Sequence, residues 1–122
     1  MTKNLLVLTA VLEAAAGVGM LTMPAVGISL LLGTSLDAPG ALTVARMTGA
    51  AMLSLGVACW LARHDGQTRP GRGVIAAMLV YNIAAAVILV YAGLAMGLHG
   101  IGLWPAAGMH AALAVWCVAC LH

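Results

Sequence analysis

The sequence predicts an all-α fold, a transmembrane four-helix bundle with a short interfacial segment after a proline-broken first helix. Composition is the first reason: 64% of the 122 residues are hydrophobic and only 7% are charged. A soluble domain of this length carries roughly a quarter charged residues and could not hide so much apolar surface from water. The second reason is that the apolar residues form runs of about 20, the length of a helix that spans a bilayer.

Four runs qualify as spans, and together they make residues 1–122 a single membrane domain. Their expected ranges are about 4–23, 40–62, 73–97 and 103–121. Continuing the first helix through Pro24 to Leu32 would make it about 42 Å long, too long for an upright span. We therefore expect a break at Pro24, followed by a short helical piece along the interface. Asp37 is expected to cap the second span, with Pro39 in its first turn.

The distribution of basic residues predicts the topology. The only hydrophilic segment carries Arg63, Arg69 and Arg72, and short loops rich in Arg and Lys stay in the cytoplasm. An even number of spans puts Lys3 and the C-terminus on that same side. We expect a multi-pass protein of the bacterial inner (cytoplasmic) membrane with both termini cytoplasmic. The first residues have the pattern of a signal peptide, but Glu13 lies where such segments are uncharged, so we expect them to be retained.

Small residues indicate where the spans pack closely, because they let helix backbones approach each other. The third span contains a GxxxG motif, Gly93 to Gly97, and the first span pairs Ala15 with Gly19. The second span has a series of small residues that includes Ala45, Gly49 and Gly56. These motifs favour a compact bundle. GxxxG also marks dimer faces, so a homodimer or a larger membrane complex stays open.

Each span carries one strongly polar residue toward the middle of the membrane: Glu13, Arg46, Asn82 and His110. A lone charge at that depth costs at least about 2.5–3.5 kcal/mol. We therefore expect Glu13 and Arg46 to turn inward and pair, with Asn82 and His110 satisfying the remaining polar groups. Two alternatives stay open. The pair is either a structural ion pair that fixes helix register, or part of a proton- or substrate-binding site in which Glu13 titrates and His110 relays.

The helical period predicts which residues accompany this site. The expected inner face of the first span comprises Thr9, Glu13, Ala16, Gly17 and Met20, and that of the fourth comprises Ala106, Ala107, His110, Ala114 and Cys117. Most of these neighbours are small. They leave room for a partner side chain, a water molecule or a ligand.

Cysteines and histidines gather toward the end of the bundle that carries the hydrophilic loop: Cys59, Cys117, Cys120, His64 and His122. Such donors suit a soft metal such as zinc or copper. However, a CxxC motif on a membrane helix lacks the loop geometry of a zinc site, and a free cysteine often packs as a small buried hydrophobe. We therefore predict no metal. A haem would need two deep histidines, and only His110 is deep, so no cofactor is predicted either.

Several function classes lack their signatures. The chain contains no nucleophile–base–acid triad, phosphate loop or nucleotide fingerprint, so we expect a non-enzymatic protein. Five basic residues and a net charge of +2 do not make a nucleic-acid footprint. The lipid bilayer is the one partner that the composition itself predicts.

Two stretches, "LEAAAGVGMLTMPAVGISLLLG" and "ARMTGAAMLSLGVACWLAR", resemble DoxX-like small bacterial membrane proteins. The shared features are four helices, a proline-broken first hairpin and an arginine entering the second span. Many members of that family have no assigned activity, and some accompany oxidoreductases as membrane subunits. The resemblance implies an accessory subunit or a small-ligand-binding membrane protein, with a membrane subunit of an oxidoreductase as a third alternative.

The position of Glu13 also resembles that of the membrane-buried glutamate in small multidrug resistance transporters. In that family the glutamate exchanges protons for cationic drugs across a dimer of four-helix chains. This sequence departs from the family pattern, because its first span contains no Tyr or Trp and its third lacks the Gly- and Pro-rich pattern. The resemblance implies a small proton-coupled transporter that uses Glu13 as the alternative function.

Overall fold

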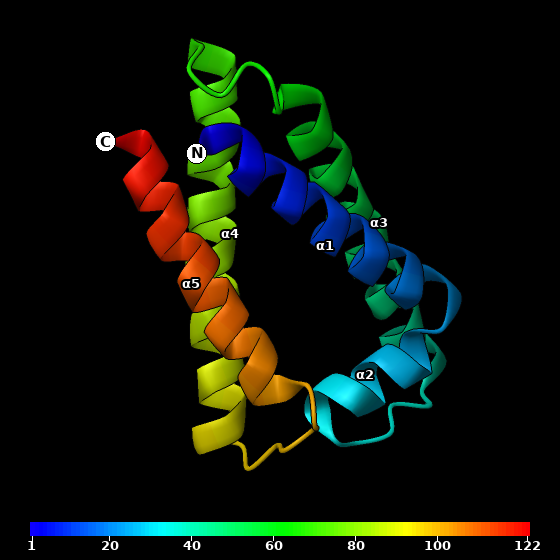
Figure 1. The fold of residues 1–122 in the computed structure, drawn as a ribbon. Coiled ribbons are helices and arrows are strands. Elements are labelled where there is room, and N and C mark those ends of the chain that lie inside the picture. Colours follow the sequence, from blue (N-terminus) through cyan, green and yellow to red (C-terminus); the bar gives the residue numbers. More distant parts are fainter.

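The computed structural model describes residues 1–122 and contains five helices and no strand (Figure 1). The helices are α1 (Thr2–Thr22), α2 (Pro24–Leu32), α3 (Pro39–Ala62), α4 (Arg69–Leu94) and α5 (Leu103–Leu121). Helices α1, α3, α4 and α5 are long and apolar enough to cross a membrane. The predicted all-α fold with four membrane-spanning helices is confirmed.

The four long helices form two pairs that lean against each other. Helix α1 packs along α3 and α4 packs along α5, whereas contacts between the two pairs are few. Figure 1 shows the pairs approaching each other near the start of α1 and separating toward α2. Helix α2 lies across the wider end, between the end of α1 and the start of α5. It is held to the start of α5 by a hydrogen bond that the Gly102 N–H donates to the Leu30 carbonyl at 2.8 Å.

The predicted break at Pro24 is confirmed. Helix α1 ends at Thr22, and Met23 takes a non-helical conformation with φ −132° and ψ 60°. Pro24 then opens α2, because its missing N–H would have no intrahelical partner in a first turn. The end of α2 is Gly33, whose φ of 69° lies in the left-handed region that glycine adopts without strain.

Close contact between α1 and α3 depends on glycines. A Cβ atom on Gly17 would lie 2.7 Å from the Gly49 carbonyl oxygen, and one on Gly56 would lie 3.0 Å from the Ala10 carbonyl oxygen. The predicted small series on α3 therefore is an interface. The predicted Ala15–Gly19 pair makes no helix contact within this chain, because Ala15 is exposed and a Cβ on Gly19 would meet nothing within 4 Å.

Two further local predictions are wrong for identifiable reasons. Helix α3 begins after Ala38 without a side-chain cap, so Asp37 does not cap it. Helix α4 ends at Leu94, and Gly97 has a φ of 67° beyond that end. The Gly93–Gly97 motif is therefore not a continuous helix face.

Helix α4 also starts four residues earlier than the predicted start at residue 73. The Thr68 hydroxyl caps it by accepting from the Gly71 N–H at 3.2 Å. Pro70 lies in the first helical turn of α4. Proline is tolerated there because no N–H is required.

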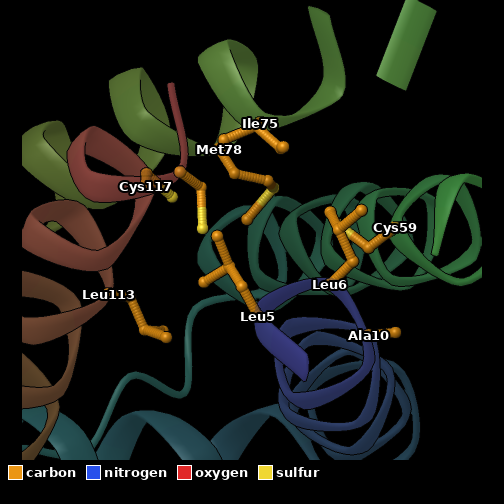
Figure 2. Packing of buried hydrophobic residues seen from close by; sticks show 9 residues of the cluster. Leu5, Leu6, Ala10, Cys59, Ile75, Met78, Leu113 and Cys117 are labelled. Carbon is orange, nitrogen blue, oxygen red and sulfur yellow. The ribbon is translucent and has the colours of Figure 1, made fainter. Parts of the chain in front are cut away.

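A cluster of apolar side chains joins the two pairs where they approach each other. Figure 2 shows Leu5 of α1 pointing toward Met78 of α4 and Cys117 of α5. All three side chains are almost fully buried. The outer surfaces remain apolar, since Val87 and Val115 are 62% and 71% exposed. A protein with apolar residues both inside and outside is suited to lipid and not to water.

Candidate functional site

Helix α1 turns two polar side chains toward the other helix pair. Thr9 and Glu13 are four residues apart and share one face of α1, and only 1% and 2% of their surfaces are exposed. The Thr9 hydroxyl oxygen and the Glu13 Oε2 atom have no hydrogen-bond partner. Buried polar atoms are nearly always paired, so two unpaired oxygens on one helix face indicate a candidate binding site.

Opposite them, Asn82 of α4 and His110 of α5 form a buried hydrogen-bonded pair. The Asn82 Nδ2 donates to the Met78 carbonyl at 2.8 Å, and Asn82 Oδ1 lies 2.8 Å from His110 Nδ1. Because a carbonyl can only accept, the first bond fixes which amide atom is the nitrogen. Asn82 Oδ1 must then accept from the N–H at His110 Nδ1. In neutral His110 the lone pair is therefore on Nε2.

Tyr81 connects the two sides. Its ring meets the His110 ring edge-to-face, with 5.6 Å between centroids and 85° between planes. Its hydroxyl lies on the side of the Glu13 carboxyl, although no hydrogen bond joins the two groups. Tyr81 was not among the site residues predicted from the sequence. The available signal was a phenol in the middle of an apolar helix, which usually needs a polar partner.

Arg46 does not belong to the site, and its predicted pairing with Glu13 is wrong. Arg46 is exposed, and no ion pair joins it to Glu13. The antiparallel register of α1 and α3 explains why. Gly17 lies against Gly49 and Leu53, which puts Arg46 at least about seven residues, or about 10 Å, from the level of Glu13. The opposite charges of Glu13 and Arg46 predicted an ion pair, but the register of the two helices keeps these residues at different levels.

The predicted inner faces are correct in most positions. On α5, Ala107, His110, Ala114 and Cys117 are buried and Ala106 is half-buried. On α1, Thr9, Glu13 and Gly17 are buried, whereas Met20 is half-buried and Ala16 is exposed. Ala16 turns outward because α1 meets α3 through Ala10, Ala14 and Gly17, which lie on a different side of the helix.

The cysteines contribute packing next to this site. Cys59, Cys117 and Cys120 are free and buried, and all three belong to the apolar cluster of Figure 2. His64 and His122 are exposed. No group of three or more His, Cys, Asp or Glu side chains converges in a way that could hold a metal ion.

The chemistry of the site is that of a hydrogen-bond acceptor without a cation. Glu13 Oε2 has no donor, and the lone pair of neutral His110 is on Nε2. The Thr9 hydroxyl can donate or accept. None of the five arginine and lysine side chains forms an ion pair there. We designate Thr9, Glu13, Tyr81, Asn82 and His110 the polar site.

Comparison of the chain with protein-family models, with characterised proteins and with solved structures finds no match. The fold and the site define the class by themselves. The protein is a small multi-pass integral membrane protein with four membrane-spanning helices. A buried polar site lies between its two helix pairs.

Proposed function

We propose that this protein is non-enzymatic and binds a small hydrogen-bond-donating ligand in the polar site. The observation that carries the proposal is the pair of unpartnered buried oxygens on Thr9 and Glu13. Each unsatisfied buried group costs about 1–3 kcal/mol, and more when it is charged. A ligand that donates to both atoms recovers that energy and gains affinity from it.

The orientation of the site specifies the ligand further. An ionised Glu13 only accepts hydrogen bonds, and neutral His110 offers a lone pair at Nε2. A protonated amine or another small cation with N–H groups satisfies both side chains. An anion finds no basic side chain in the site.

The experiment is to identify what the purified protein carries. Wild-type protein and the Glu13→Gln variant are purified in the same mild detergent, and their small molecules are extracted and compared by mass spectrometry. We expect a nitrogen-containing small molecule in the wild type and its loss from Glu13→Gln. Arg46→Gln is the matched control, since it removes a strongly polar group from a span but outside the site.

Two results would contradict the proposal. If Glu13→Gln retains the same extracted molecules as the wild type, the carboxylate does not hold them. The second result is that neither protein yields a ligand and Glu13→Gln unfolds at higher denaturant concentration. The buried Glu13 carboxyl would then only destabilise the fold and would bind nothing. Both outcomes require that the variant remain folded, which size-exclusion chromatography checks.

A second candidate function is proton-coupled transport with Glu13 as the carrier of the proton. The exposure of Arg46 favours it, because no arginine neutralises Glu13. The test is a liposome that contains the protein, a pH-sensitive dye inside and tetramethylammonium, a permanent cation, outside. Transport predicts a proton flux on addition of the cation that Glu13→Gln abolishes. No flux above that of empty liposomes counts against it.

The cellular setting is part of the proposal. The resemblance to DoxX-like proteins supports a bacterial inner-membrane location. It is also compatible with an accessory role beside an oxidoreductase. Arg63, just after α3, and Arg69 and Arg72, in the first turn of α4, support cytoplasmic termini. Reporter domains fused in turn to each terminus and to the loop after Gly97 would test that orientation.

A further inference from the structure

A second polar pocket lies at the end of the bundle where α1 begins and α3 passes into α4. Figure 1 shows these two segments at the same end of the molecule. The pocket has a volume of about 230 Å³ and only one of its lining residues is hydrophobic. Lys3, Arg63 and His64 line it. Asp65, the one acidic residue of the loop, does not line it.

The walls of this pocket are held by specific contacts. The Gln67 amide nitrogen donates to the Thr2 hydroxyl at 3.0 Å, which fastens the loop to the start of α1. Gly66 is buried against Thr2, so only a residue without a side chain lets the loop approach this closely. Thr68 closes the other side of the loop by donating to the Asp65 carbonyl at 2.7 Å. Contacts within the chain therefore fix the walls of the pocket.

Arg63 is oriented by its own helix. Its guanidinium lies 4.2 Å from the centroid of the Trp60 ring and donates to the Trp60 carbonyl. These contacts use one of its five N–H groups and one face, so the remaining donors stay free. Lys3 makes no side-chain hydrogen bond or ion pair and keeps all three of its donors. The pocket thus presents donors and positive charge without a counter-ion.

We propose that this pocket, termed the basic pocket, binds a phosphate group. Lys3 is in the first turn of one span, and Arg63 follows the last residue of another. These positions place the pocket at the depth of lipid headgroups, where the half-exposed Trp60 also marks the interface. Basic pockets between membrane helices hold the headgroups of anionic lipids. A volume below the roughly 300 Å³ of drug-sized sites fits one small anionic group.

The experiment measures binding to the intact protein by native mass spectrometry. One arm uses detergent micelles that contain phosphatidylglycerol, a second uses phosphatidylcholine, and a third uses phosphatidylcholine with added inorganic phosphate. A basic residue near a membrane surface contributes about 1 kcal/mol of attraction to anionic lipid, which corresponds to about fivefold in affinity, so we expect Lys3→Gln to weaken phosphatidylglycerol binding about fivefold. Arg63→Gln should do the same.

Arg69→Gln is the matched control, because it removes one positive charge from the same end of the molecule but outside the pocket. We expect less than a twofold change for this variant. Binding of inorganic phosphate that Lys3→Gln weakens, without a preference for phosphatidylglycerol, would support the pocket with a free anion as its source. An equal loss for Arg69→Gln and Lys3→Gln would overturn the proposal, because general charge and not the pocket would then attract the ligand. So would the absence of any binding above that to phosphatidylcholine.

Discussion

Gly17 lies where the backbones of the two long helices α1 and α3 approach each other most closely, which makes it the glycine that tests this interface. A Cβ atom there would lie 2.6 Å from the Leu53 backbone nitrogen and 2.7 Å from the Gly49 carbonyl oxygen. Both atoms belong to the α3 backbone, so no side chain can rotate away. Gly17→Ala must instead push the two helices apart.

The size of the effect follows from these distances. Ordinary van der Waals contact begins at 3.4 Å, so α3 must move by about 0.8 Å. A gap of 0.5–1 Å forfeits a quarter to a half of the dispersion attraction between atoms. Overpacked sites typically lose about 1–3 kcal/mol of stability. We expect Gly17→Ala to lower the free energy of unfolding by about that amount relative to its control.

The control is Gly19→Ala, two residues away on the same helix. A Cβ at this position meets nothing within 4 Å. Both variants gain the same helix propensity from alanine, about 1 kcal/mol on scales measured in water, so that term cancels in the comparison. The assay is reversible unfolding of the purified protein in mixed micelles of mild detergent and dodecyl sulfate. The reasoning is refuted if Gly17→Ala is as stable as Gly19→Ala.

Three further predictions follow from single contacts and use the same unfolding assay. In a double-mutant cycle, Glu13→Gln and Arg46→Gln should be additive within about 0.5 kcal/mol, because the residues are apart; a coupling near 1 kcal/mol or more would restore the ion pair. Asn82→Leu should cost about 1–3 kcal/mol because it leaves a buried His110 N–H without an acceptor, and it should cost less in a His110→Leu background; equal costs would contradict the bond. Thr68→Ala should cost about 1 kcal/mol through loss of the α4 cap, while Thr68→Ser should restore it; a stable alanine variant would show that the cap is dispensable.

Much of the fold could be predicted because lipid imposes a simple rule on sequence. Each span must be an apolar run of about 20 residues, and a proline must end or begin a helix. The break at Pro24 and the four spans follow from these rules alone. The helix ends that were predicted wrongly depend on tertiary contacts and not on these rules. Asp37 and Gly97 were assigned from local preferences, and the observed ends depend on how each helix meets its neighbours.

The polar site was predicted in part for a related reason. The helical period puts Thr9 beside Glu13, and the cost of burying polar groups in lipid turns Asn82 and His110 inward. The erroneous partner, Arg46, came from counting charges by depth alone. Only the register between α1 and α3, fixed by the glycine contact, determines which residues share a level. No pattern within a single helix contains that information.

The position of the polar site gives its occupancy a mechanical consequence. Thr9 and Glu13 belong to one helix pair, whereas Tyr81, Asn82 and His110 belong to the other. Within each pair the helices pack along their length, but the pairs touch each other at few places. A ligand that bonds to both sides therefore adds its contacts where the molecule has fewest of its own. We expect such a ligand to stabilise the arrangement of the two pairs more than either pair alone, because the tightly packed interior of each pair does not change.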